Sequence, residues 1–194
     1  FEKVLHENTD SLLFHPVSSS YQDEYEARIP LLLMYPTIVN DERKLFIGAQ
    51  PFSYLGIPAE RLKDDRTPEY DGIDIRQLLG NEQADRLLLS SALRMSCTFP
   101  YILPNVYLPT DPQIEVMDAG IRDNYGIESS VRFATTFRHW IDSNTSGIVV
   151  LNIRGLENSM PIRENVSSGI LEKVISPIGN LYLNWVEVQD YQHD

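Results

Sequence analysis

Small and apolar residues recur at helical spacing in two long stretches of the chain. The first stretch follows Asn81, a good N-cap residue, and Pro100 prevents it from continuing. Its stripe consists of positions three and four residues apart: Ala84, Leu87, Leu88, Ser91, Ala92 and Met95. The second stretch runs from near Ile127 to the polar residues 143–147. The pattern predicts one long helix in each stretch, and a similar spacing after Asn180 predicts a third.

Shorter runs rich in apolar and β-branched residues predict strands at 29–35, 37–40, 45–48, 114–117 and 148–153. Between the second and third of these runs, Asn40 to Arg43 predict a hairpin turn. The last run is apolar at nearly every position, which is typical of a strand covered on both faces in a parallel sheet. With the helix before it, this run gives the strand, helix, strand order of a βαβ unit. We therefore expect an α/β fold with a mixed or mostly parallel sheet flanked by helices.

The chain has 194 residues, which is the length of one domain. Residues 1–28 are mostly polar and predict a connecting segment with at most a short helix. The predicted strands and helices all lie in residues 29–194. Within this region, residues 54–74 contain Gly, Pro and several acidic residues, and they predict an irregular, solvated excursion.

Charge and composition exclude several classes of function. The chain carries 16 basic and 28 acidic side chains, a net charge of −12, and its basic residues form no run. Nucleic acid and anionic membranes both attract clustered Lys and Arg, so this balance argues against them. No apolar stretch approaches the ~20 residues of a membrane-spanning helix. Because the sequence begins at Phe1 without the features of a signal peptide, we expect a piece of a larger protein, and a cytoplasmic or membrane-associated location is favoured over secretion.

The most informative stretch joins the end of the first predicted helix to the start of the second. It reads Ala92-Leu93-Arg94-Met95-Ser96-Cys97-Thr98-Phe99-Pro100, and later Met117-Asp118-Ala119-Gly120-Ile121-Arg122-Asp123-Asn124. This arrangement resembles the C-terminal part of the patatin-like phospholipase domain. In that family an Ala-x-Arg-Ala-Ser-x-Ala-x-Pro segment precedes a strand that ends in Asp-Gly-Gly or Asp-Gly-Ala, followed by x-x-Asn-x-Pro and a helix. The matching positions are Ala92, Arg94, Ser96, Pro100, Asp118, Gly120 and Asn124.

The resemblance implies that residues 29–194 are the C-terminal portion of a patatin-like α/β hydrolase domain. It implies a lipid acyl hydrolase that acts on acyl esters with a Ser-Asp dyad and needs no cofactor or metal. Asp118 would be the dyad acid, because a carboxyl shielded at the end of a strand can accept a proton from a serine hydroxyl. The turn would be shaped by Ala119, Gly120 and Asn124, and the acyl pocket would lie near Ser96, Phe99 and Pro100. The other interpretation of Asp118 is that it only caps its turn.

Two departures from the family pattern leave the function open. Ala119 stands where the family has Gly, and no Gly-x-Ser-x-Gly nucleophile motif or Gly-rich oxyanion loop occurs in the chain. We therefore expect the acid of the dyad without its nucleophile, and an inactive fragment of an enzyme. Membrane contact would come through the missing parts, and a sheet edge left exposed beside 114–117 would favour a homo-oligomer. The alternatives are a non-catalytic α/β binding or scaffolding module, and an unrelated α/β protein whose turn is a coincidence.

Other chemistry has weaker support in the sequence. Cys97 is the only cysteine, which excludes a disulfide within the chain. No base adjoins it that would make it a nucleophile, so we expect a buried structural thiol. The four histidines are far apart, so a zinc site is not predicted. The acidic residues between 64 and 74 lack the alternating pattern of a calcium loop and are interpreted as a solvated loop.

Overall fold

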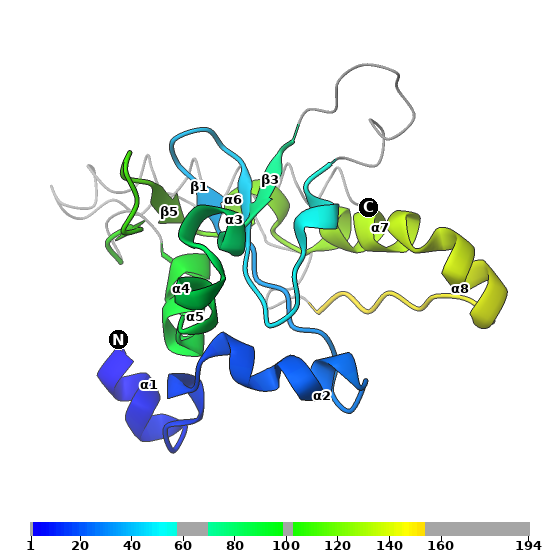
Figure 1. Ribbon diagram of the computed structural model, residues 1–194, viewed down its shortest axis with the longest axis horizontal. Helices are drawn as coiled ribbons and strands as arrows, with labels where there is room; N and C mark the ends of the chain where they lie inside the picture. Colours follow the sequence, from blue (N-terminus) through cyan, green and yellow to red (C-terminus); the bar gives the residue numbers. More distant parts are fainter. Residues whose placement is uncertain (1, 58–69, 99–102, 154–194) are drawn as a thin grey trace, which may run out of the picture.

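The computed structural model describes residues 2–57, 70–98 and 103–153. These residues form a mixed five-stranded sheet with the strand order β3-β2-β1-β5-β4. The strands are β1 (Thr37–Ile38), β2 (Lys44–Phe46), β3 (Gly72–Asp74), β4 (Val106–Tyr107) and β5 (Glu115–Met117). Only β2 and β3 are parallel, and the other three pairs are antiparallel. With helices on the sheet, this arrangement confirms the predicted α/β class with a mixed sheet (Figure 1).

The strands agree with the sequence pattern in part. The hairpin of β1 and β2 forms around the expected turn, and β5 forms where a strand was predicted. Strand β5 pairs with β1 on one side and with β4 on the other, so the exposed sheet edge expected beside 114–117 is wrong. The predicted strand at 29–35 is reduced to a bridge between Met34 and Ile47, because Pro30 and Pro36 at its ends have no N–H to donate. Strand β3 lies in the stretch that predicted only irregular structure. Its Gly72 packs directly on Phe46, where an added Cβ would be 2.4 Å from a ring carbon.

Three short helices pack on one face of the sheet, namely α3 (Ile75–Leu79), α4 (Asn81–Asp85) and α5 (Leu89–Ser96). The single helix predicted after Asn81 is therefore wrong, since two helices occupy that stretch. Leu88 separates them with an extended backbone, forms a bridge with Pro16, and leaves the carbonyl of Leu87 to accept the N–H of Val17. A contact with a distant segment thus overrides the local helical pattern.

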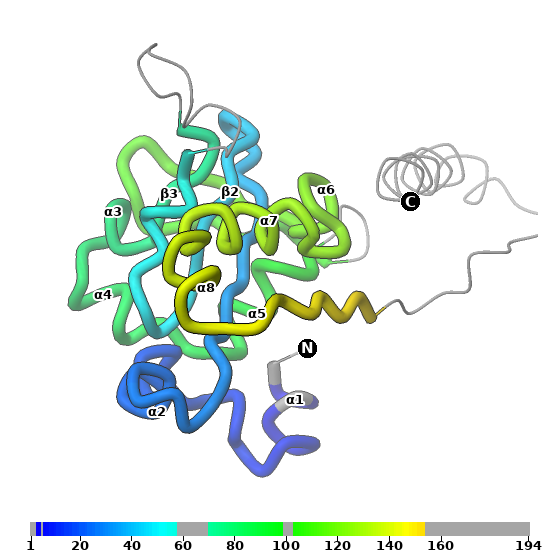
Figure 2. Tube along the Cα trace, turned by 90° about the vertical axis from the view of Figure 1, so that its right-hand side faces the viewer, coloured from blue at the N-terminus to red at the C-terminus, as the bar shows by residue number. Residues whose placement is uncertain are grey.

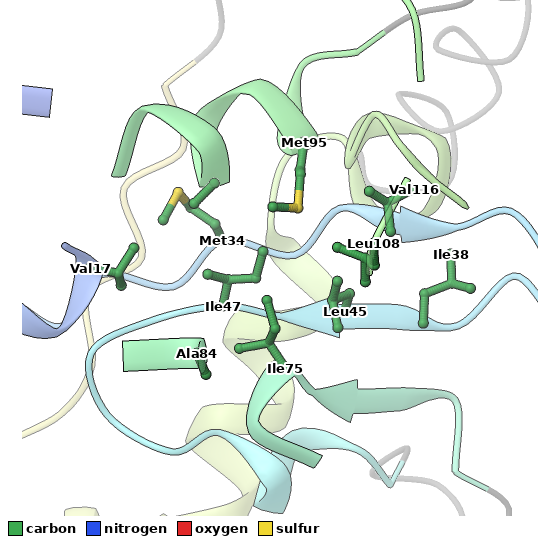
Figure 3. Packing of buried hydrophobic residues seen from close by; sticks show 11 residues of the cluster. Val17, Met34, Ile38, Leu45, Ile47, Ile75, Ala84, Met95, Leu108 and Val116 are labelled. Carbon is green, nitrogen blue, oxygen red and sulfur yellow. The ribbon is translucent and has the colours of Figure 1, made fainter. Parts of the chain in front are cut away.

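The main hydrophobic core lies between these helices and the sheet (Figure 3). Leu45 and Ile38 reach it from the strands, Ile75 from the start of α3, and Met95 from α5. Val17 enters the same core from the N-terminal segment. Strand residues alternate between the two faces of a sheet, so Lys44 and Phe46, the neighbours of Leu45, lie on the opposite face.

The N-terminal segment contains more helix than its polar composition predicted. It forms α1 (Glu2–Asn8), two 3-10 turns (Leu12–Phe14 and Val17–Ser20) and α2 (Tyr21–Tyr25). These helices lie together at one end of the molecule in Figures 1 and 2. Because Val17 is buried in the core, the segment packs on the domain and is not a simple connection.

The second face of the sheet carries α6 (Gly120–Asp123) and α7 (Ile127–Thr136), which continues after Phe137 as α8 (Arg138–Asn144). The helix predicted from Ile127 begins where expected, but the single long helix is wrong, because Phe137 divides the stretch into α7 and α8. A smaller core on this face contains Phe46, Phe52 and Leu55, and Phe133 of α7 packs against it. Phe52 directly precedes the 3-10 turn Ser53–Leu55, and Leu55 is the last residue of that turn.

The strand predicted at 148–153 does not form, so the predicted βαβ unit is absent. These residues have no helix or strand assignment, and Val149 is 94% exposed. They run back beneath α7 in Figure 1, and their end projects away from the helices in Figure 2. An apolar run signals burial, but a strand also needs a neighbouring edge, and no described residue pairs with this run. The helix predicted after Asn180 lies outside the described residues.

None of the helices in the described part of the chain has the length and apolar character that crossing a bilayer requires.

Candidate functional site

Asp118 follows β5 directly, and its backbone is held by two other segments. Its N–H donates to the carbonyl of Thr98, which follows α5, at 2.9 Å. Its carbonyl accepts the hydroxyl of Thr37, on β1, at 3.0 Å. The end of the strand is therefore fixed on both sides before the chain enters the turn of residues 118–124, which we call the acid turn.

The carboxylate of Asp118 is half-buried and is oriented by the acid turn. The N–H of Gly120 donates to Asp118 Oδ1 at 2.6 Å. Burial raises the pKa of Asp118 above its usual value, although the Gly120 hydrogen bond opposes this shift. A carboxylate with a raised pKa is a better proton acceptor than a fully solvated one, because it binds a proton more tightly.

Gly120 is the glycine of the acid turn, and the turn leaves no space for a side chain at this position. A Cβ on this residue would lie 2.7 Å from Asp118 Oδ1 and 2.7 Å from Asn124 Oδ1, so the three residues pack without room for a side chain. Ala119 has φ −66° and ψ −31°, a helical conformation that alanine adopts without strain. The departure from the family pattern at position 119 therefore does not distort the turn.

Of the remaining predicted site residues, the structure describes Ser96, the last residue of α5. Ser96 accepts the N–H of Ala119 on its carbonyl at 3.2 Å, so its backbone contacts the acid turn. Its hydroxyl donates to the carbonyl of Ala92 at 3.1 Å, within its own helix. Phe99 and Pro100 lie outside the described residues. Of the residues expected near the acyl pocket, Ser96 is therefore the one that the structure describes.

Cys97 is exposed, and its thiol interacts electrostatically with the Asp118 carboxylate. Partial burial raises the pKa of the thiol, and the Asp118 carboxylate raises it further against the opposing charge of Arg94. The thiol is therefore held in its protonated form at neutral pH. The buried structural thiol expected from the sequence is wrong, because the Cys97 side chain is exposed.

A buried ionic cluster lies behind the acid turn, and the sequence did not reveal it. The side chain of Lys44 is 0% exposed, and its Nζ is 2.8 Å from Glu128 Oε2, 3.3 Å from Asp123 Oδ2 and 3.4 Å from Ser129 Oγ. The Tyr35 ring lies 5.6 Å from the same nitrogen. Lys44 precedes the predicted strand at 45–48, so the local pattern gave no indication that its side chain is buried.

Asp123 joins this cluster to the start of α7. Its carboxylate accepts the N–H groups of Glu128 at 3.3 Å and Ser129 at 2.9 Å, and the Ser129 hydroxyl at 2.9 Å. Burial would raise the pKa of Asp123, but the Lys44 charge and these hydrogen bonds outweigh it and hold the pKa below its usual value. Asp123 is therefore a fixed anion that accepts N–H groups from the first turn of α7, and it is not suited to accept a proton.

An apolar cavity of about 710 Å³ lies on the same face of the sheet. Its walls come from Leu31–Leu33, from α7 and from residues 147–151, and none of the described residues that line it is charged. Tyr125 and Gly126, which follow the acid turn, belong to its lining. Burial raises the pKa of Tyr35, whose side chain also lines the cavity, and the Asp123 charge raises it further, so the phenol stays neutral.

The acidic residues of the stretch 64–74 have structural partners where the structure describes them. Asp71 pairs through both oxygens with the guanidinium of Arg132, a residue of α7 that also contacts Glu128. Asp74 caps α3 and accepts the N–H of Phe52 at 2.6 Å. Among residues 2–57, 70–98 and 103–153, no three His, Cys, Asp or Glu side chains come together as metal ligands would.

Comparison of the chain with protein-family models, curated proteins and solved structures finds no match.

Proposed function

We propose that this chain is the acid-bearing part of a serine acyl hydrolase that acts on acyl esters of lipids, with Asp118 as the proton acceptor. The observation that carries the proposal is the environment of one carboxylate. Asp118 stands at the end of a strand, is half-buried with a raised pKa, and is oriented by the N–H of Gly120. Asp118 is the described acid that has these three features and that also lies next to the motif residues Gly120 and Asn124.

The chemistry assigns one proton transfer to Asp118. Its carboxylate takes the proton of a serine hydroxyl as the serine oxygen attacks the ester carbonyl. The proton then passes to the leaving alkoxide, which departs as an alcohol and leaves an acyl-serine for water to hydrolyse. The chain has no Gly-x-Ser-x-Gly motif, so the proposal places the nucleophile on polypeptide outside these 194 residues.

The apolar cavity supports an ester with a hydrocarbon chain. Its lining, as far as the structure describes it, contains no charged residue and includes Tyr125, which directly follows the acid turn. A volume of about 710 Å³ lies within the range of small-molecule sites, which bury most of a ligand on apolar walls. A hydrocarbon chain would bury apolar surface against these walls, which a charged or sugar-like substrate would not.

The experiment compares the longer polypeptide that contains these residues with the 194-residue chain alone. Each is incubated with a p-nitrophenyl ester and with a fluorophosphonate probe that labels active serines. We expect turnover and labelling of the longer polypeptide only. Labelling of the 194-residue chain would contradict the placement of the nucleophile, and a longer polypeptide that neither reacts nor is labelled would support a non-catalytic module instead.

Two variants of the longer polypeptide test the acid. Asp118→Asn keeps the shape and removes the proton acceptor, so we expect turnover to fall by about 10³ or more. Asp142→Asn is the matched control, because Asp142 is 65% exposed on α8 and pairs only loosely with Arg138 at 3.6 Å. Turnover that survives Asp118→Asn at the level of the control would remove Asp118 from the mechanism.

A further inference from the structure

We propose that Lys44 and Thr37 are positioning residues that hold the acid turn from its two ends. The inference rests on the proposed role of Asp118. Thr37 and Lys44 are directly opposite one another in the antiparallel hairpin of β1 and β2. Opposite residues of two strands present their side chains on the same face, so both reach the side of the sheet where the acid turn lies.

Thr37 holds the first residue of the acid turn. It is 3% exposed, and its hydroxyl donates to the carbonyl of Asp118 at 3.0 Å. Thr37 is also opposite Met117 across β1 and β5, which places it beside the last residue of the strand. The hydroxyl therefore fixes the point at which the backbone leaves the sheet and, with it, the direction of the Asp118 side chain.

Lys44 holds the other end through Asp123. Its Nζ is 3.3 Å from Asp123 Oδ2, and the N–H of Asp123 donates back to the carbonyl of Ala119 at 3.2 Å. Asp123 also accepts the N–H groups at the start of α7, so the Lys44 contact ties the turn and the helix to the sheet together. One cross-strand pair thus anchors residues 118 and 123, with Gly120 between them.

Stability alone does not require a lysine at this position. A buried ion pair is often no more stabilising than apolar residues of similar volume, because both charges lose their hydration. The Lys44 ammonium instead fixes the position of the Asp123 carboxylate. The groups around Lys44 Nζ are Asp123, Glu128, Ser129 and the Tyr35 ring, so the ammonium group contacts other parts of the fold. Lys44 therefore acts through Asp123 and not on a substrate.

The test uses Thr37→Val and Lys44→Met, with Thr37→Ser as the conservative variant that keeps the hydroxyl. Lys3→Met is the control, because the Lys3 side chain is 87% exposed. In the longer polypeptide we expect kcat to fall roughly tenfold to a hundredfold in Thr37→Val and Lys44→Met, with KM changed less than about twofold. Thr37→Ser should restore most of kcat. Folded Thr37→Val and Lys44→Met proteins with wild-type kcat would overturn the inference.

A second measurement does not depend on activity. The Gly120 amide donates to Asp118, so its NMR shift and the pH dependence of that shift report the geometry and the pKa of that carboxylate. We expect this signal to move in Thr37→Val and not in Thr37→Ser, even if Lys44→Met fails to fold. An unmoved signal in Thr37→Val would overturn the inference. If instead the signal moves while Asp118→Asn keeps full turnover, the positioning holds and the proposed function fails.

Discussion

Gly120 and the Asp118 carboxylate are in direct contact, with the Gly120 amide 2.6 Å from Asp118 Oδ1. The space beside the Gly120 Cα is filled by the same oxygen and by Asn124 Oδ1, each 2.7 Å from where a Cβ would stand. The hydrogen bond and the close packing both depend on the absence of a side chain. The position of the candidate acid is therefore sensitive to the smallest possible change at residue 120.

Gly120→Ala should displace the Asp118 carboxylate or the Asn124 side chain. Because the obstructing atoms are packed in the turn, we expect a loss of about 1–3 kcal/mol in the free energy of unfolding, measured with urea. Turnover of the longer polypeptide should fall with it. The control is Ala119→Gly, which needs no new space and should leave turnover near the starting level. Equal turnover in Gly120→Ala and Ala119→Gly would show that the contact does not position the acid.

The raised pKa of Asp118 has opposite consequences for activity and for stability. Only the ionised carboxylate accepts a proton, so kcat/KM should fall as the pH decreases through the pKa of Asp118. Above that pKa the folded protein holds a half-buried charge that the unfolded chain would hydrate better, which lowers stability. We therefore expect Asp118→Asn to increase the free energy of unfolding at pH 7 while it abolishes turnover. A decrease in stability at pH 7 would contradict the burial argument.

Asp123 should control the resistance of the fold to acid. Its pKa in the folded protein lies below that in the unfolded chain, so its contribution is present at pH values above the ordinary aspartate pKa of ~3.9. That contribution is lost as the pH falls through the lowered pKa. In Lys44→Met the burial remains and the neutralising charge is gone, so acid unfolding followed by circular dichroism should begin at a higher pH. The exposed Lys3→Met variant should unfold at the same pH as the unmodified chain.

The sequence pattern predicted those elements whose signals are local. The hairpin after Pro36, strand β5 and the helix from Ile127 each have their apolar spacing and their turn or cap residues within a few positions. The break at Leu88 was not predictable in this way, because it depends on a contact with Pro16 and Val17. The run 148–153 predicted burial from its composition, but composition does not specify a partner strand.

In the candidate site too, residues with local signals were predicted and residues that depend on distant contacts were missed. The motif around Asp118 identified Gly120 and Asn124, which are neighbours in sequence and in space. Thr37 and Lys44 were missed because their partners lie 81 and 79 residues away along the chain, at Asp118 and Asp123. No periodicity or short motif encodes such contacts. They become visible only when the sheet order places β1 between β2 and β5.

The guanidinium of Arg132 should stabilise the second face of the sheet in a way that lysine cannot replace. The side chain is 3% exposed, pairs with both oxygens of Asp71, and donates to the carbonyl of Leu55 at 3.0 Å. A lysine ammonium cannot reproduce this planar set of donors. We expect Arg132→Lys to lower the free energy of unfolding by about 2 kcal/mol. Arg138→Lys, at a 74% exposed position of α8, should change it by less than about 0.5 kcal/mol.

The exposed apolar run 148–153 should cause the chain to self-associate. Val149, Leu151 and Ile153 are 94%, 81% and 83% exposed, and the run has no strand partner among the described residues. An extended, uncharged, β-branched edge can pair with a second copy through its free backbone groups and bury its side chains there. Sedimentation velocity of the chain should therefore show a weight-average mass that rises with concentration. Val149→Lys should suppress this rise, because pairing would bury the added charge, whereas Val131→Lys, at a 53% exposed position of α7, should not. A chain that stays monomeric at all concentrations, or equal suppression by both variants, would show that this run is not the associating edge.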